Sequence, residues 1–385
     1  MKRFSLITRL GKTEAAKVNV LQRDSSVHEL DFLDGDNRLA YGLGQALAQL
    51  ASLGLTTPET AIDLALLAGL VNAADTRVSR DINAQGGWTR EIDLYLPVSD
   101  PDRWSAQADH IGKMLRFLTG DRWRLFFRLR PKEASSLSVA TDKLPLHGLD
   151  EVSLFSGGLD SLIAAIDSLT EGTHPLFVSH YWDAETAKAQ SYLLERLETK
   201  FGDEAFKSMR VRLGFDRNAL DTGQTEDTQR GRSFLFYALA SLAAASFGTK
   251  TTVNVPENGL IALNVPLDPL RFGALSTRTA HPHFMASMQR LLDGLGLQVS
   301  LNNPYRHRTK GEMTDDCADK AYLRTIVGSS MSCSSPAKAR YKGLSPRHCG
   351  YCVPCLIRRA SLKAGLGSDD PTLYTVEDLS AQTLR

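Results

Sequence analysis

The chain has 385 residues, of which 42% are hydrophobic, enough for roughly two to three domains with buried cores. Its 45 basic and 44 acidic residues give a formal net charge of +1. This balance provides no overall field for polyanions, so a nucleic acid is not expected as a direct partner. The longest apolar stretch, LALLAGLV at 64–71, is too short to span a bilayer, and the first residues lack a signal-peptide core. We therefore expect a cytoplasmic protein that does not interact with membranes.

The first 149 residues alternate between stretches typical of strands and stretches typical of helices. In chain order they are RFSLITRL (3–10), TTPETAIDLALLAGLVNAA (56–74), REIDLYLPV (90–98), DRWSAQADHIGKMLRFLTG (102–120) and RWRLFFRLR (122–130). The second of them begins with a threonine cap and places Pro58 in the first helical turn. GLGQAL at 42–47 lacks the third glycine and the preceding strand of a dinucleotide loop, so we interpret it as a helix. Residues 1–149 are predicted to form an α+β domain that binds a protein partner, since they contain no phosphate-binding loop.

Arginines alternate with aromatic residues in the stretch RWRLFFRLR. A nucleic-acid surface would use such a pattern. Alternation by itself, however, requires only a pleated strand whose side chains point to opposite faces. We interpret the stretch as an edge or half-buried strand with one solvated face.

After residue 149 the pattern becomes a regular alternation of strands and helices. The strand-like runs are VSLF (152–155), HPLFVSHY (174–181), SMRVRLGF (208–215) and TTVNVP (251–256). The helical stretches between them are DSLIAAIDSL (160–169), AETAKAQSYLLERLETKFG (184–202) and RGRSFLFYALASLAAASFG (230–248). Such alternation predicts an α/β fold, with a parallel sheet and helices on both of its faces. Ligands of such sheets bind at the carboxyl ends of the strands.

The sequence SGGLDS, Ser156 to Ser161, lies at one of these strand ends. Gly157 and Gly158 allow a turn whose backbone N–H groups converge on an anion, and the dipole of the following helix favours a phosphate at the same place. The serine hydroxyls add donors, and Asp160 offers a carboxylate to Mg²⁺. The alternative is a plain strand-to-helix turn capped by Asp160. No Gly-x-x-x-x-Gly-Lys is present, so a P-loop kinase or GTPase is not supported.

All five cysteines lie in the last quarter of the chain. Cys349, Cys352 and Cys355 form C-x-x-C-x-x-C, and Cys333 supplies a fourth thiolate. This set matches a closed, tetrahedral structural zinc site, with an iron–sulfur cluster as the alternative. Cys317 is left over, and we interpret it as a buried residue within a helix.

SGGLDS resembles the signature of the PP-loop ATP pyrophosphatases, which form adenylates and release pyrophosphate. Together with the C-terminal cysteines, it resembles the 7-cyano-7-deazaguanine synthase (QueC-like) family. That family adenylates 7-carboxy-7-deazaguanine, forms the amide and dehydrates it to the nitrile with a second ATP. The resemblance runs from about Glu151 to Ala360. It implies an adenine nucleotide alpha hydrolase-like fold, with Ser156, Gly157, Gly158, Leu159, Asp160 and Ser161 binding ATP and with Asp160, Lys310 and Arg232 in catalysis.

The resemblance also covers smaller segments. RGRSFLF at 230–236 matches an arginine-bearing turn beside the nucleotide, the segment Thr309 to Glu312 matches Thr-Lys-x-Glu, and Arg358 matches the arginine after the last cysteine. Two features depart from the family: the extension before Glu151, and residues 254–284 in place of the segment that encloses the base. Both resemble the QueC-like component (QatC) of Qat anti-phage systems.

The expected organisation has a partner-binding extension at 1–149, a PP-loop domain at 150–330 and a zinc-binding segment at 331–385. The expected cofactors are ATP, Mg²⁺ and Zn²⁺, and the expected substrate is a deazapurine carboxylate. The product would be an amide, a nitrile or a protein conjugate, made together with other proteins of a defence complex. Arg278 and His281 are candidate acceptor contacts, and Glu257 and Asn258 are candidate readers of the base or ribose. The alternatives are a tRNA-modifying PP-loop enzyme and a non-catalytic nucleotide-sensing scaffold.

Overall fold

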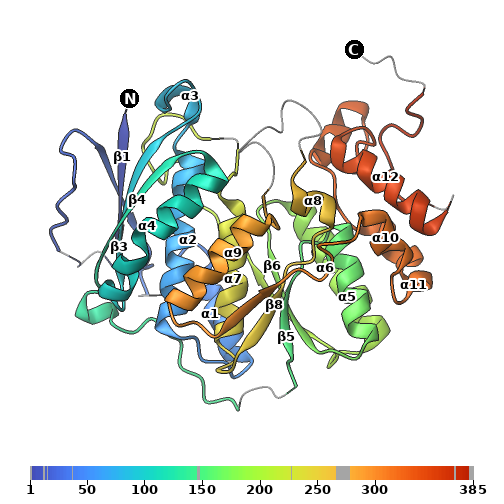
Figure 1. The fold of residues 1–385 in the computed structure, drawn as a ribbon, viewed down its shortest axis with the longest axis horizontal. Coiled ribbons are helices and arrows are strands. Elements are labelled where there is room, and N and C mark those ends of the chain that lie inside the picture. The colour runs from blue at the N-terminus through green and yellow to red at the C-terminus, as the bar shows by residue number, and fades with distance from the viewer. Residues whose placement is uncertain are drawn as a thin grey trace. The chain divides into compact units, whose positions relative to one another are not determined.

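The computed structural model describes residues 2–11, 14, 16–36, 38–144, 148–226, 228–265, 278–367 and 370–380. The chain forms two compact units built from helices and parallel strands (Figure 1). The first unit comprises Met1–His147, Met209–Val253 and Asp268–Leu301, and the second comprises Gly148–Ser208, Asn254–Leu267 and Asn302–Arg385. The assignment of separate functions to residues 1–149, 150–330 and 331–385 stays a prediction.

The first unit contains a four-stranded sheet in the order β2-β1-β3-β4. Its strands are β1 (Arg3–Arg9), β2 (Ser26–Asp31), β3 (Glu91–Val98) and β4 (Arg122–Leu129). Each neighbouring pair is parallel, and Leu6 of β1 lies opposite Leu94 of β3. The expected α+β arrangement of this region is therefore wrong, because all neighbouring strands are parallel; helix α4 (Pro101–Thr119) makes the crossover from β3 to β4, whereas no helix lies among the described residues between β1 and β2.

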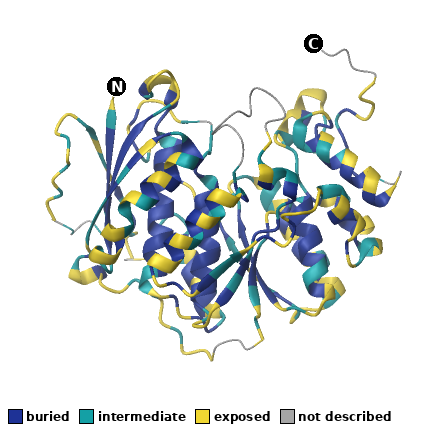
Figure 2. Ribbon diagram, viewed as in Figure 1, coloured by how far each residue is buried: buried dark blue, intermediate teal, exposed yellow. Residues whose placement is uncertain are grey.

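The helices of the first unit bury long apolar faces. They are α1 (Leu43–Ser52), α2 (Glu59–Arg77), α3 (Arg80–Asn83), α4 (Pro101–Thr119), α7 (Arg232–Ala245) and α9 (Pro282–Gly294). Helix α2 is buried at every residue from Ala61 to Thr76 (Figure 2). It packs on α7 and on strands β1 and β3, while α4 packs on α9 and β4. A helix that is apolar on all sides is stable only in such a covered position.

Two local predictions in the first unit have different outcomes. GLGQAL lies almost entirely in α1, which confirms a helix there. Helix α2 begins one residue later than predicted, since Pro58 is the residue before its first turn and has an extended backbone. The Thr57 hydroxyl does not cap the helix but lies 2.9 Å from the hydroxyl of Ser246.

Strand β4 lies at the edge of its sheet, as the alternating arginines predict. The Arg124 guanidinium donates to both carboxylate oxygens of Asp93, at 2.7 and 2.5 Å. Arg122 pairs with Glu91 at 3.2 Å. These two arginines therefore neutralise acidic residues of the neighbouring strand, which favours the interpretation as an edge strand over a nucleic-acid surface.

The second sheet has five strands in the order β7-β6-β5-β8-β9. They are β5 (Glu151–Leu154), β6 (Pro175–His180), β7 (Lys207–Val211), β8 (Thr251–Asn254) and β9 (Val299–Asn302). The sheet is all parallel and flanked by helices, which confirms the α/β class predicted for this part of the chain.

The helices of the second unit surround a core formed largely by α5. They are α5 (Leu159–Thr170), α6 (Ala184–Phe201), α8 (Gly259–Leu263), α10 (Lys310–Asp315), α11 (Lys320–Ile326) and α12 (Val353–Leu366). Three-ten turns occur at Lys132–Ala134 in the first unit and at Val327–Ser329 and Pro336–Lys342 in the second. Leu162 and Ile166 of α5 are fully buried in this core.

Cys317 is buried in the same core, as predicted. It does not lie within a helix, however, because α10 ends at Asp315 and α11 begins at Lys320. The Asp319 side chain caps α11 and accepts a hydrogen bond from the N–H of Tyr322, so the helical pattern of this stretch is interrupted. None of the described helices is long and apolar enough to cross a membrane.

Candidate functional site

The six residues Ser156–Ser161 form a tight turn at the carboxyl end of β5. Gly157 has a left-handed backbone (φ 79°), and a Cβ at this position would lie 3.1 Å from Cγ of Gln190. Glycine is therefore required here by both conformation and space. The hydroxyls of Ser156 and Ser161 lie 3.2 Å apart across the turn. The structure thus places the predicted loop residues together at the N-terminus of α5.

Asp160 joins this loop to two distant segments of the second unit. Its side chain is buried, with Oδ1 2.9 Å from Nζ of Lys310. Its Oδ2 accepts hydrogen bonds from the Asn258 side-chain amide at 2.7 Å and from the Asn258 backbone N–H at 3.3 Å. Two of the predicted catalytic residues, Asp160 and Lys310, are therefore in contact.

A capping box fixes Lys310 at the first position of α10. The Thr309 hydroxyl accepts from the N–H of Glu312 at 3.2 Å, and the Glu312 carboxylate accepts from the N–H of Thr309 at 2.6 Å. The Thr-Lys-x-Glu spacing has a plain structural reason, since this reciprocal cap satisfies two backbone donors and starts the helix. The box therefore sets the position from which the lysine reaches Asp160.

Glu257 adds a second carboxyl group to this set. Burial raises its pKa to about 7, and the neighbouring Asp160 carboxylate acts in the same direction, while Lys310 opposes it. Lys310 thus pairs with Asp160 and also acts electrostatically on Glu257. A carboxyl group with a raised pKa in a cluster of charged side chains is one sign of a candidate functional site.

Arg232, the third predicted catalytic residue, is the first residue of α7 in the first unit. Its guanidinium lies 4.8 Å from the ring of Phe236, one turn along the same helix. Asp75 holds the turn before it, because its Oδ2 accepts the N–H of Gly231 at 2.7 Å. The catalytic role of Arg232 stays a prediction.

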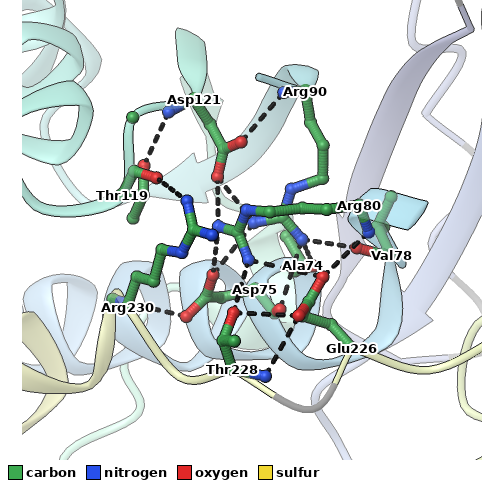
Figure 3. A network of polar contacts seen from close by, with 12 residues as sticks. Ala74, Asp75, Val78, Arg80, Arg90, Thr119, Asp121, Glu226, Thr228 and Arg230 are labelled. Atoms are coloured by element: carbon green, nitrogen blue, oxygen red, sulfur yellow. Dashed lines mark hydrogen bonds and ion pairs between the residues drawn. The ribbon is translucent and has the colours of Figure 1, made fainter. Parts of the chain in front are cut away.

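The same turn belongs to a buried ion-pair network in the first unit (Figure 3). Arg80 and Arg90 both donate to Asp121 Oδ2 at 2.6 Å, and both also contact Asp75 Oδ1, at 3.1 and 2.9 Å. All four side chains are at most 2% exposed. Opposite charges placed this close compensate much of the cost of burying them.

Further contacts extend this network along the chain. Arg90 also donates to the backbone carbonyls of Ala74, Asp75 and Val78, near the C-terminus of α2. Glu226 accepts from the backbone N–H of Arg80 at 2.8 Å. The network therefore fixes the end of α2 to the segment that leads into α7.

Arg278 and His281 pack against α4 in the first unit. The Arg278 guanidinium lies 4.4 Å from the ring of Phe117 and donates to its backbone carbonyl. The His281 ring is 4.9 Å from the same ring, and its Nδ1 caps α9 by accepting the N–H of His283 at 3.1 Å. Residues 266–277 of the segment 254–284 lie outside the described residues. No role of Arg278 or His281 toward an acceptor follows from these contacts.

The sulfur atoms of Cys333, Cys349, Cys352 and Cys355 lie within 4.8 Å of one another. Cys333 and Cys352 are 4.0 Å apart, and Cys349 and Cys355 are 3.8 Å apart. A tetrahedral zinc ion with Zn–S bonds of about 2.3 Å requires S–S separations of about 3.8 Å, so the cluster fits Zn²⁺. This confirms that the four predicted ligands come together in a set that is compatible with zinc.

The backbone around the cluster supports the same conclusion. N–H groups of Cys349 and Ser335 donate to Sγ of Cys333 at 3.3 and 3.4 Å, as expected around thiolates. Gly350 has a φ of 91°, and a Cβ there would lie 2.4 Å from the carbonyl oxygen of Val376. Burial lowers the pKa of His348 to about 3, so its neutral ring accepts the N–H of Ser332 at Nε2, at 3.2 Å.

Sequence reasoning missed Gln190. Its side-chain amide donates to the carbonyl of Ser156 at 3.3 Å and to that of His180 at 3.1 Å. Gln190 is fully buried on the face of α6 that carries Leu193 and Leu197. A glutamine at the helical spacing of an apolar face was the available signal, because a buried amide must find partners.

No family model matches the sequence, and the search of curated proteins gave no significant match.

Proposed function

We propose that the chain is an ATP-dependent enzyme that adenylates a carboxylate substrate. A carboxylate oxygen attacks the α-phosphorus of ATP, the bond to the β-phosphate breaks, and pyrophosphate leaves. A nitrogen nucleophile then attacks the carbonyl carbon and displaces AMP. The observation that carries this proposal is the contact of Asp160 with both Lys310 and Asn258 at the start of α5, directly after the Ser-Gly-Gly turn.

Each residue of this set has a chemical role in the proposed adenylation. The turn and the N-terminus of α5 would offer backbone donors and a helix dipole to a phosphate. In this structure, the N–H groups of Gly158 and Leu159 donate to the hydroxyls of Ser156 and Ser332, at 3.3 and 3.4 Å. Lys310 provides a positive charge for the phosphate oxygens, and Asp160 holds it in place until the nucleotide binds. The Asp160 carboxylate is the type of ligand that Mg²⁺ prefers, and a bound Mg²⁺ would neutralise part of the phosphate charge.

The substrate class comes from the resemblance to the QueC-like family. It suggests 7-carboxy-7-deazaguanine or a related deazapurine, converted to an amide, a nitrile or a protein conjugate in anti-phage defence. The cysteine cluster supports this proposal, because the resemblance includes a zinc site and the four sulfur atoms fit one.

The test is turnover of ATP labelled at the α- or the γ-phosphate, in the presence of the deazaguanine carboxylate and ammonia. We expect AMP and pyrophosphate from the parent protein. Asp160→Asn and Lys310→Met are each expected to lower turnover by ~10²-fold or more. Lys113→Met is the matched control, since Lys113 pairs with Asp109 on an exposed helix surface.

Other products would change the assignment. Release of ADP and phosphate from the parent protein would exclude adenylation. Tight ATP binding without turnover, lowered by Lys310→Met, would favour a nucleotide-sensing scaffold. Adenylation that requires tRNA in place of the deazaguanine would favour a tRNA-modifying enzyme.

A further inference from the structure

A short segment of the second unit, Val327–Cys333, connects the cysteine cluster to the Ser156–Ser161 loop. At its start, the buried Arg358 of α12 donates to the Ser330 hydroxyl at 2.9 Å and to the Val327 carbonyl at 2.6 Å. At its end, Cys333 belongs to the cluster that includes Cys355 of α12. Both ends of the segment are therefore held by the same helix.

The middle of this segment contacts the loop. The N–H of Met331 donates to the carbonyl of Gly157 at 2.8 Å, and the N–H of Leu159 donates to the hydroxyl of Ser332 at 3.4 Å. A Cβ at Gly158 would meet the Met331 carbonyl oxygen at 3.6 Å and the Ser332 hydroxyl at 3.9 Å. The loop therefore rests on the two residues that precede Cys333.

These contacts set the direction of the loop peptides. Met331 binds the carbonyl of Gly157, and Gln190 binds the carbonyl of Ser156. In the trans peptide that joins Gly157 to Gly158, the C=O and N–H groups point in opposite directions. Holding the carbonyl against Met331 therefore turns the N–H of Gly158 away from Met331.

We propose that the metal-bound cysteine cluster positions the Ser156–Ser161 loop, and that Met331 and Ser332 transmit this effect. Without the metal, Cys333 loses its anchor, the contacts of Met331 and Ser332 loosen, and the loop amides lose their fixed directions. Met331 and Ser332 are positioning residues. The consequence for nucleotide binding rests on the proposed function, whereas the coupling between cluster and loop does not.

The first test compares Ser332→Ala with Ser332→Thr, which keeps the hydroxyl, and with Ser345→Ala, which removes an exposed hydroxyl elsewhere in the C-terminal segment. Ser332→Ala is expected to keep its zinc and to raise amide hydrogen exchange at residues 157–159 by about tenfold, as for the loss of one hydrogen bond. The KM for ATP should rise by a similar factor. Ser332→Thr should restore both values, and Ser345→Ala should change neither. Unchanged exchange in Ser332→Ala would overturn the proposal.

The second test removes zinc from the folded full chain with a chelator and follows amide exchange at residues 156–161 without nucleotide, over the period in which strands β5 and β6 stay protected. We expect faster exchange at the loop while the strands of the first unit stay protected. Loop exchange that is unchanged in folded, zinc-free protein would also overturn the proposal. Faster loop exchange in a protein that never binds ATP would instead support the coupling and refute the proposed function.

Discussion

Two clusters of buried charged or ionisable side chains, one in each compact unit, are balanced differently. In the first unit, two arginines and two aspartates, Arg80, Arg90, Asp75 and Asp121, neutralise one another within hydrogen-bond distance. In the second unit, Lys310 faces the two carboxyl groups of Asp160 and Glu257, and four thiols lie together in the cysteine cluster.

We interpret the first cluster as structural and propose a functional role for the charges of the second unit. A balanced network stabilises its unit without a ligand, whereas two carboxyl groups around one lysine, or four thiolates, need a proton or a metal ion to reach balance. We therefore expect a metal ion at the cysteine cluster, and a cation and a nucleotide beside Asp160 and Lys310. The following predictions test this contrast, beginning with the largest expected effect.

Loss of the metal should have the largest effect. Cys349→Ser removes one of four ligands, and binding of a structural zinc ion contributes ~10 kcal/mol to folding. We expect a low yield of this variant in the soluble fraction of the cell extract. Metal analysis of the purified parent should find about one zinc per chain. Visible absorbance with bound iron would identify an iron–sulfur cluster instead. A stable Cys349→Ser protein that retains its zinc would show that the cluster is not the metal site.

Breaking the balanced network should cost less but still be severe. Arg90→Met leaves Asp75 and Asp121 with less positive charge, and loss of one partner of a buried pair costs about 3–5 kcal/mol of unfolding free energy. Denaturant unfolding of the variant and the parent measures this loss of unfolding free energy. The matched control is Arg122→Met, whose side chain is 60% exposed and pairs with Glu91, with an expected cost below about 1 kcal/mol. Equal costs for the two variants would refute the contrast between buried and exposed pairs.

Glu257 should make stability depend on pH. Its folded pKa of about 7 lies above the ordinary value of 4.5, so the folded protein holds an extra proton between these values. The contribution of Glu257 to stability therefore falls as the pH rises from 4.5 to 7. Glu257→Gln should stabilise the protein above pH 7, by up to about 3 kcal/mol, and should have little effect at pH 4.

Glu312→Gln is the control for this pH dependence. Hydrogen bonds from the backbone and side chain of Thr309 lower the pKa of Glu312, so the sign is opposite. Its replacement should cause a small loss of stability near neutral pH that disappears in acid. Unfolding midpoints between pH 4 and pH 8 give both results. If Glu257→Gln is no more stable than the parent at pH 8, the carboxyl group has a normal pKa in solution.

The smallest effect is expected at Cys317. This thiol is buried outside the metal cluster, and burial raises its pKa to about 12, so it stays protonated. Cys317→Ala should cost about 1 kcal/mol of stability and leave the zinc content unchanged. A fall in zinc content would show that Cys317 takes part in the metal site.

Local patterns predicted the elements and the short motifs. Examples are the strand before Ser156 and the C-x-x-C-x-x-C spacing, which each span only a few residues, so that local backbone geometry decides the outcome. The capping box of Thr309 and Glu312 was not predicted. β2 and β9 were missed because their alternation is weak: β2 contains one fully buried residue, Leu30, and β9 has four residues.

Contacts between distant segments were not predictable in this way. Asn258 lies 98 positions from Asp160, and Met331 is far from Gly157 in the sequence. Their meeting depends on the order of strands and helices, which hydrophobic periodicity does not specify. The parallel pairing of the first sheet was missed for the same reason, since alternation predicts a strand but not the direction of its neighbour.

The burial of α2 from Ala61 to Thr76 also affects how this protein is made on the ribosome. One of its faces is covered by α7, whose residues 232–245 emerge long after residue 77 has been synthesised. Until then, the nascent chain exposes the face of α2 that α7 covers in the folded protein. Nascent chains that end between these two helices are expected to bind chaperones or aggregate, because exposed apolar surface drives both outcomes. Synthesis through α7 should end this exposure.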